Sequence, residues 1–222
     1  MKIATWNLER PKVSTKTRNA KIIEKLKGID ADILILTETN SIIHPGAAYT
    51  SFATPALPLS KGPAHSVGEN RTTIWSKYPG SKHLETYDDL TSICVGIQTP
   101  LGHLNVYGTI IGIYGNREES FKVDLKKQLE DWRKICAAGN ICIAGDFNIT
   151  FADNYYYTKE GRQKIKDCFS ELSINNLTDQ IPENIDHIAI ATSFLKSSEI
   201  KTEVWNEDKS LSDHMGVCVV LK

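Results

Sequence analysis

The sequence predicts an α/β fold in which two mixed, mostly antiparallel β-sheets pack face to face with helices on the outside. Segments with strand and helix periodicity alternate along all 222 residues, giving about nine strands but only three helices. Parallel strands need long crossovers, usually helical, so three helices are too few for a doubly wound parallel sheet. A helix-covered two-sheet sandwich accommodates this element order. No repeat or linker divides the chain, and we expect a single domain over residues 1–222.

The first part of the chain predicts a strand, a helix and a second strand. Residues 3–6 form the first strand, and residues 17–27 carry apolar side chains at helical spacing, with Gly28 as the helix stop. Residues 32–37 form a continuous apolar run, which is typical of a strand buried on both faces. The segment 41–70 is rich in Pro, Gly and Ser, and predicts a long irregular loop that is either functional or mobile.

Hairpins and two more helices follow. The clearest helix covers residues 118–136, where apolar side chains share one face, and another covers 160–172. The turn 99–102 is expected to close a hairpin. Further strands are expected at 73–75, 92–98, 103–111, 140–144, 185–192, 200–205 and 215–221.

Composition excludes several classes of protein. The 26 Lys and Arg residues nearly balance 27 Asp and Glu residues, a formal charge of -1, which argues against a broad basic surface as the main grip on nucleic acid. No apolar run approaches the length of a membrane span, and the N-terminus lacks the apolar region of a secretory signal, so no leader is expected. Five cysteines without a CxxC pair favour reduced thiols in a cytoplasmic protein.

Five polar clusters each sit at an end of an apolar strand. Side chains from distant segments converge at such ends in layered α/β proteins. Together the clusters supply carboxylates, carboxamides and an imidazole, and so many carboxylates would repel one another without a cation. Oxygen ligands favour a hard ion such as Mg²⁺ over zinc. The clusters are Trp6-Asn7, Thr37–Thr39, Gly145–Asn148, Asp186-His187 and Ser212–His214.

Each cluster taken alone also has a purely structural explanation. Glu38 can be a solvated loop carboxylate, and the residues around Asp146 can form an Asx turn that leaves the strand. Asp186 can cap a helix or a turn, and Ser212 or Asp213 can bind the backbone before the last strand. The functional interpretation depends on the joint occurrence of the clusters in one order.

In that order the sequence resembles the endonuclease/exonuclease/phosphatase superfamily, which includes pancreatic-type DNases and exonuclease-III-like enzymes. The matching segments are Thr5–Asn7, Leu36–Glu38, Gly145–Asn148, Ile185–Ile188 and Ser212–His214, and they span almost the whole chain. The resemblance implies a four-layer α/β sandwich and a metal-dependent phosphoesterase.

The resemblance also implies a metal site. Glu38 would be the principal Mg²⁺ ligand, with Asn7 and Asp213 helping to hold the ion or its waters. Mn²⁺ would be able to substitute for Mg²⁺. The metal would offset the negative charge that grows on the phosphoryl oxygens during the reaction.

Four residues would make up the catalytic part of the site. By resemblance, Asp146 would orient or deprotonate the attacking water, and Asn148 would bind a phosphate oxygen. Asp186 would hold the imidazole of His214 in one tautomer, and His214 would contact the scissile phosphate or transfer a proton. His187 should point to the opposite face of its strand and is left out of the site.

Some positions depart from the family pattern. Many members carry a second catalytic His, or a Tyr, at the end of the strand that corresponds to 103–111, and here Tyr107 is the candidate substitute; a buried strand tyrosine is the alternative. Glu9 either assists the metal or is a surface charge, with the second favoured. Arg71 either meets a substrate phosphate at the cleft mouth or is a surface arginine. The run 155–157 either stacks on a base or sugar or packs its own loop.

We therefore expect an enzyme that uses Mg²⁺ to hydrolyse phosphodiester bonds in DNA or RNA by attack of water. The alternative is a phosphatase or phosphodiesterase that acts on a small or lipid-linked substrate with the same site. A degenerate, purely binding member is disfavoured because the core carboxylates, Asn148 and His214 are all present. The partner is nucleic acid or another phosphoester, and the protein is expected to act as a monomer.

Overall fold

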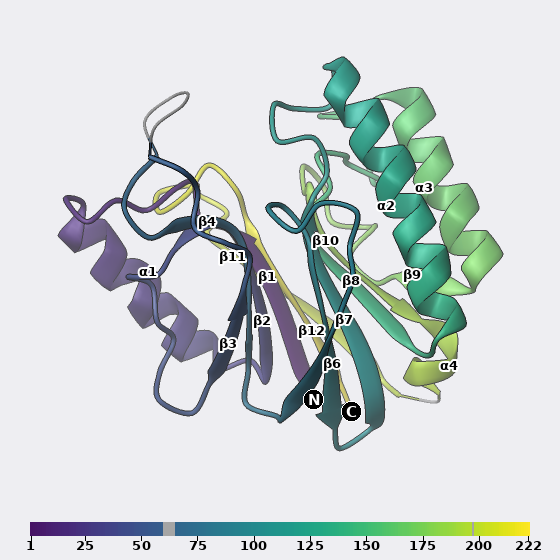
Figure 1. The fold of residues 1–222 in the computed structure, drawn as a ribbon, viewed down its shortest axis with the longest axis horizontal. Helices are drawn as coiled ribbons and strands as arrows, with labels where there is room; N and C mark the ends of the chain where they lie inside the picture. Colours follow the sequence, from purple (N-terminus) through teal and green to yellow (C-terminus); the bar gives the residue numbers. More distant parts are fainter. Residues whose placement is uncertain (60–64, 197) are drawn as a thin grey trace.

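Two six-stranded β-sheets face each other in the computed structural model, which describes residues 1–59, 65–196 and 198–222 (Figure 1). The first sheet has the spatial order β11 (Ile200–Trp205), β12 (Gly216–Leu221), β1 (Lys2–Asn7), β2 (Ile33–Asn40), β4 (Glu69–Ser76) and β3 (Thr50–Ala53). The second has the order β5 (Gly80–Leu84), β6 (Ile93–Thr99), β7 (Gly102–Ile110), β8 (Ile141–Asp146), β10 (Asp186–Ala191) and β9 (Ile174–Asn176). The helices are α1 (Lys16–Ile29), α2 (Glu119–Ala137), α3 (Lys159–Leu172) and α4 (Thr192–Leu195).

Strand direction follows the connections. The pairs β1–β2 and β7–β8 are parallel, and α1 and α2 supply their crossovers. The other pairs in both sheets are antiparallel. The expected hairpin turn is confirmed, since Thr99 pairs with Gly102 where β6 meets β7. The predicted mixed, mostly antiparallel character of the sheets is thereby confirmed.

Four layers follow from three apolar cores. Helix α1 covers the outer face of the first sheet, and α2 and α3 cover that of the second (Figure 1). The run in β2 shows why such a strand is apolar throughout: Ile33 and Ile35 pack between the sheets, whereas Leu34 and Leu36 pack under α1. Burying apolar surface on both faces stabilises the fold by roughly 25 cal/mol for each Å² removed from water. The predicted four-layer sandwich is confirmed.

Two local expectations were wrong. Gly28 lies inside α1, which ends at Ile29. Its C-cap is Asp30, which has a left-handed φ of 50° and whose N–H donates to the Leu26 carbonyl oxygen. The segment 41–70 is not wholly irregular, because it contains β3, which pairs with residues 73–76 of β4; its residues 60–64 lie outside the described part. The strands β3, β5 and β9 and helix α4 were missed because each is short and carries little apolar periodicity.

The state of the cysteines and the character of the helices can be compared with what the composition predicts. All five cysteines are free thiols, four of them buried and Cys136 half-buried. Within residues 1–59, 65–196 and 198–222, no helix is long and apolar enough to cross a membrane.

One edge of the sandwich collects the polar strand ends. The parallel pairing of β1 with β2 aligns Asn7 with Thr37, and the antiparallel pairing of β8 with β10 places Asp146 opposite Asp186. Strand β1 of the first sheet contacts β8 and β10 of the second. Strand ends from both sheets therefore meet at a single site.

Candidate active site

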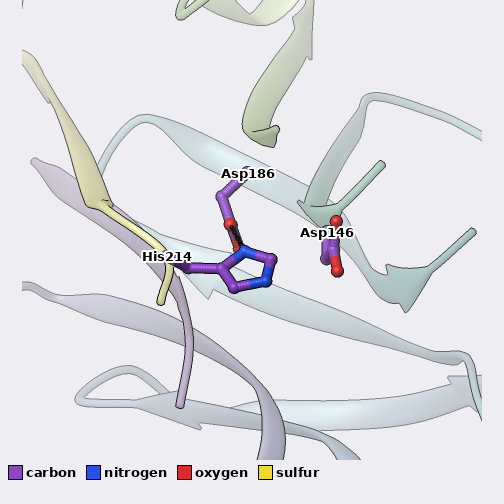
Figure 2. Close-up of side chains that lie close together, drawn as sticks. All are labelled: Asp146, Asp186 and His214. Atoms are coloured by element: carbon purple, nitrogen blue, oxygen red, sulfur yellow. Dashed lines mark hydrogen bonds and ion pairs between the residues drawn. The ribbon is translucent and has the colours of Figure 1, made fainter. Parts of the chain in front are cut away.

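Asp146, Asp186 and His214 form the centre of this site (Figure 2). Asp146 ends β8, Asp186 begins β10, and His214 lies in the loop before β12. One ligand atom from each lies within 4.8 Å of those of the other two. The register of β8 with β10 brings Asp146 and Asp186 together. The loop before β12, a strand of the other sheet, places His214 beside them.

His214 and Asp186 form a hydrogen-bonded pair. Nδ1 of His214 lies 2.6 Å from Oδ2 of Asp186 (Figure 2). Burial alone would lower the pKa of His214, but the charges of Asp186 and Asp146 outweigh it and raise the pKa to about 10. The imidazole is therefore cationic at neutral pH, and its Nδ1–H donates to the carboxylate. The side chain keeps 12% of its surface exposed, so the ring can still meet a ligand.

The backbone around His214 is fixed from three sides. The indole Nε1 of Trp6 donates to the His214 carbonyl oxygen at 3.0 Å, and Nδ2 of Asn206 donates to the same oxygen at 2.7 Å. The hydroxyl of Ser212 donates to the Asn7 carbonyl oxygen at 2.6 Å. These bonds tie the loop to the end of β1 and set the position of the imidazole.

Asp146 is a buried carboxylate that accepts hydrogen bonds from Asn148 and Asn7. Its Oδ1 accepts from the backbone N–H of Asn148 at 2.8 Å, and its Oδ2 accepts from Nδ2 of Asn7 at 3.1 Å. Burial raises the pKa of Asp146; His214 opposes the rise, Asp186 adds to it, and the result is about 7. A carboxylate with a pKa near neutrality suits general base catalysis at physiological pH.

The glycine before Asp146 is required by the backbone. Gly145 has a φ of +135°, and a Cβ at this position would lie 2.0 Å from the Thr109 carbonyl oxygen of the neighbouring strand. Only glycine fits this close approach of β7 and β8. In the sequence Gly145-Asp146-Phe147, the glycine thus meets a packing requirement, and the buried carboxylate of the candidate site follows it.

Asn148 is brought into the site but is turned toward the protein. Its Nδ2 donates to the carbonyl oxygens of Ile111 at 3.1 Å and Gly112 at 3.2 Å. Its own carbonyl accepts from Nδ2 of Asn116 at 2.6 Å. In this structure, Asn148 joins the chain after β7 to the chain after β8, and its amide protons are engaged in those contacts.

Glu38 and Arg71 face each other across β2 and β4. The pairs Thr37–Thr72 and Thr39–Asn70 bracket them, so Arg71 is the cross-strand neighbour of Glu38. Burial raises the pKa of Glu38, and the nearby charges of Arg71 and His214 act in the opposite direction. Glu38 is therefore a half-buried acid that interacts electrostatically with His214.

The comparisons with known proteins agree with this geometry. Residues 4–214 match the model of the Endonuclease/Exonuclease/phosphatase family. The chain belongs to this family. Its members hydrolyse phosphoester bonds, and the chain is accordingly a phosphoesterase. No curated protein sequence matches the chain.

Solved structures show the same fold at low sequence identity. The catalytic domain of Xenopus laevis APE2 superposes with a TM-score of 0.73 at 15% identity, covering 100% of this chain and 92% of that one. The endonuclease domain of TRAS1, a telomere-specific non-LTR retrotransposon, gives 0.70 at 16%, covering 100% and 97%. An endonuclease/exonuclease/phosphatase from Beutenbergia cavernae gives 0.69 at 18%, covering 100% and 71%.

The residues at the Glu38 side of the site fit the divalent metal ion of an Endonuclease/Exonuclease/phosphatase protein. The Glu38 carboxylate is held in a buried position where its charged form is disfavoured, and a cation would relieve that cost. Oδ1 of Asp213 lies 3.7 Å from Nε2 of His214, with 66% of the side chain exposed. The amide oxygen of Asn7 accepts from the Glu9 N–H at 2.9 Å. These oxygen donors suit a hard cation.

Two sequence-predicted positions lie outside the site. Tyr107 is fully buried under α2, and its hydroxyl donates to Oδ2 of Asp131 at 2.9 Å. The expectation that Tyr107 contacts substrate is corrected, because its side chain points to the outer core of the second sheet. Glu9 pairs with Arg18 at 3.0 Å with 52% of its side chain exposed, which is the surface-charge alternative.

His187 occupies the opposite face of β10, as its strand position predicts. It is buried, its Nε2 lies 2.8 Å from the Ile149 carbonyl oxygen, and its ring packs against Phe147 and Phe151. Sequence reasoning missed two other residues, Asn116 and Lys209. Asn116 supports Asn148, and Lys209 lines a cavity beside His214. Neither lies in a recognisable motif, and each reaches the site only through loop folding.

Proposed function

We propose that this chain is a Mg²⁺-dependent nuclease that hydrolyses phosphodiester bonds of DNA or RNA by attack of water. The observation that carries the proposal is the grouping of Asp146 with the hydrogen-bonded pair Asp186–His214 at the meeting point of the two sheets. It combines a base and a cationic donor within a few ångströms, which is what in-line attack on a phosphodiester requires.

Asp146 is the proposed base. With a pKa of about 7, it is ionised in a large fraction of molecules at neutral pH and strong enough to take a proton from water. Asn7 and the backbone N–H of Asn148 fix the carboxylate by donating to its two oxygens. The water oxygen then bonds to phosphorus while the bond from phosphorus to the leaving oxygen breaks.

His214 is the proposed donor to the phosphate. Asp186 binds Nδ1, and the Nε2–H of the imidazolium, whose nitrogen lies 3.7 Å from Oδ1 of Asp213, would donate to a phosphoryl oxygen. A charged donor gains strength in a site from which water is partly excluded. Asp186 is thus a positioning residue that holds the ring and keeps it charged.

Glu38, together with Asp213 and Asn7, would hold the Mg²⁺ ion, and Mn²⁺ would fit the same oxygen ligands. A bound divalent ion supplies charge compensation for the phosphoryl and leaving oxygens. Arg71, the cross-strand neighbour of Glu38, would meet a substrate phosphate on the same side of the site.

Two features favour nucleic acid as the substrate. Similar folds include the TRAS1 endonuclease domain, and the site combines cationic side chains with exposed tyrosine suited to bases. The alternative, a small or lipid-linked phosphoester, is favoured by the formal charge of -1, which gives no broad basic surface for a long polyanion.

A substrate panel tests the proposal. Purified protein with Mg²⁺ is incubated with single-stranded DNA, duplex DNA, RNA and a phosphomonoester, and a Glu38→Gln variant controls for contaminating nuclease. Cleavage of a nucleic acid by the wild type alone is the expected result. Hydrolysis of the phosphomonoester with every nucleic acid left intact would overturn the nuclease assignment in favour of the alternative.

A further inference from the structure

A cavity lies directly beside the catalytic pair. Its volume is about 400 Å³, within the range of small-ligand pockets, roughly 300–1,000 Å³. Three loops enclose it: the loop after β8, the loop before β10 and the loop before β12. Its lining includes Tyr155, Glu183, Asp186, Lys209, Asp213 and His214.

Tyr155 and Lys209 form the most distinctive part of its lining. The Tyr155 side chain is 58% exposed although it is a large aromatic, and the Nζ of Lys209 lies 5.1 Å from the centre of its ring. This cation–π contact places an aromatic face and a positive charge together beside His214. Ile185 and Met215 add apolar surface to the same cavity.

The loop that carries Tyr155 is held in place before any ligand binds. Oδ1 of Asp153 accepts from the Tyr155 backbone N–H at 2.9 Å, and Oδ2 accepts from the Glu183 N–H at 2.6 Å. A guanidinium nitrogen of Arg162 donates to the Asp153 carbonyl oxygen. One carboxylate therefore bridges the two loops on either side of the cavity, so little ordering entropy is left to lose on binding.

The charges of the lining favour an uncharged ring over a second phosphate. Three carboxylates, from Glu183, Asp186 and Asp213, outnumber the two cations of Lys209 and His214, so an anion inside the cavity would meet a net negative lining. A nucleobase carries no such charge, and each base has a flat face that stacks on an aromatic side chain. Lys209 adds the positive charge that a phosphate flanking that base needs.

We propose that this cavity is a subsite for one unpaired nucleobase next to the scissile phosphate. Tyr155 stacks on the base, and Lys209 binds the flanking backbone phosphate. The inference rests on the proposed nuclease function and narrows its substrate to single-stranded or locally unpaired nucleic acid, because a base stacked within a duplex cannot enter a side cavity.

Binding measurements without cleavage test the subsite. The probes are a fluorescent oligothymidylate of about ten nucleotides and an abasic strand with the same number of phosphates. The protein carries Asp146→Asn to prevent hydrolysis. Because stacking contributes about 1–3 kcal/mol per base, the oligothymidylate should bind about 5- to 150-fold more tightly than the abasic strand. Adding Tyr155→Ala should abolish that ratio, and Tyr155→Phe should preserve it.

Two further variants separate specific from general effects. Tyr114→Ala removes a tyrosine that is 70% exposed and does not line the cavity, and it should leave the ratio unchanged. Lys209→Met should weaken both probes equally and reduce the salt dependence of binding by about one phosphate contact. Thermal unfolding of every variant checks that the fold is retained.

The outcomes distinguish the subsite from the nuclease proposal. Equal affinity for the two probes, or an unchanged ratio in Tyr155→Ala, would overturn the subsite while wild-type cleavage of nucleic acid still supported the nuclease. Failure of the wild type to cleave any nucleic acid would overturn the nuclease itself.

Discussion

Nδ1 of His214 and Oδ2 of Asp186 lie 2.6 Å apart, although the two residues come from segments of different sheets of the sandwich. Asp186 begins β10 in the second sheet, whereas His214 leads into β12 in the first. The bond between Asn7 of β1 and Asp146 of β8 crosses the same boundary. The active site is therefore assembled from the packing of one sheet on the other, and depends on the whole fold.

The first prediction concerns the Asp186–His214 pair and the pH dependence of kcat/KM. Replacing Asp186 with Asn removes the charge that raises the pKa of His214, so the imidazole should deprotonate at lower pH. We expect kcat/KM at neutral pH to fall about 10²–10⁴-fold and its alkaline limb to move to lower pH. The pH profile of kcat/KM measures both effects. An unchanged alkaline limb with full activity would show that His214 does not act as a cation.

The second prediction concerns the metal. Wild-type protein with Mg²⁺ at about 100 times its Kd should gain about 2.7 kcal/mol of stability, a rise in Tm of roughly 5–10 °C. Glu38→Gln should lose most of that shift, while its Tm without metal stays equal or rises because a buried charge has been removed. Thermal unfolding with and without Mg²⁺ gives the comparison.

A matched carboxylate serves as the control for Glu38. Glu9 is 52% exposed and pairs with Arg18, so Glu9→Gln should keep the full Mg²⁺ shift. If Glu38→Gln also kept the shift, the ligand role of Glu38 would have to be abandoned.

Tyr107 makes the third prediction, on stability. Its buried hydroxyl donates to Asp131, so Tyr107→Phe leaves a buried carboxylate short of one donor and should cost about 1–3 kcal/mol of unfolding free energy. The value of kcat/KM should stay within about twofold of wild type, because the side chain lies in the core. Urea unfolding and steady-state kinetics together give the answer.

The exposed Tyr87 provides the comparison for Tyr107. Its hydroxyl donates to Asp124 at 2.8 Å on the surface, so Tyr87→Phe should change stability by no more than about 0.5 kcal/mol. A Tyr107→Phe enzyme of normal stability but low activity would instead support substrate contact.

Most of the fold and the positions of the candidate site residues were predictable from local patterns. Continuous apolar runs such as 33–36 mark strands covered on both faces, and polar residues at their ends mark the site edge. Asp146, Asp186 and His214 were each identified in this way, and the structure brings them together. Apolar runs of this kind are visible in the sequence because a strand buried on both faces accepts few residue types.

The remaining features depend on tertiary contacts that no local pattern records. The direction of the Tyr107 hydroxyl depends on Asp131, which lies 24 positions further along the chain on α2. Lys209 meets Tyr155 only because two loops fold toward each other. Short edge strands such as β3 owe their form to a partner strand and have little periodicity of their own.

The last prediction concerns His187 and the stability of the fold at acid pH. The backbone carbonyl of Ile149 accepts from its Nε2, and burial lowers the pKa of the ring to about 4, so the fold holds it neutral. An unfolded histidine titrates near 6.5. Between these values the unfolded chain binds a proton that the folded chain does not, so stability is complete above pH 6.5 and falls as the pH drops toward 4.

This histidine alone should remove about 3 kcal/mol of unfolding free energy across that window, at 1.36 kcal/mol per unit of pKa difference. Urea unfolding of wild type and His187→Gln at a series of pH values isolates its share, because the other acid-sensitive groups are common to both proteins. The variant should be less stable at neutral pH, where it loses the packing of the ring on Phe147 and Phe151, and should lose less stability on acidification. Parallel curves for the two proteins would show that His187 takes up a proton without loss of the fold.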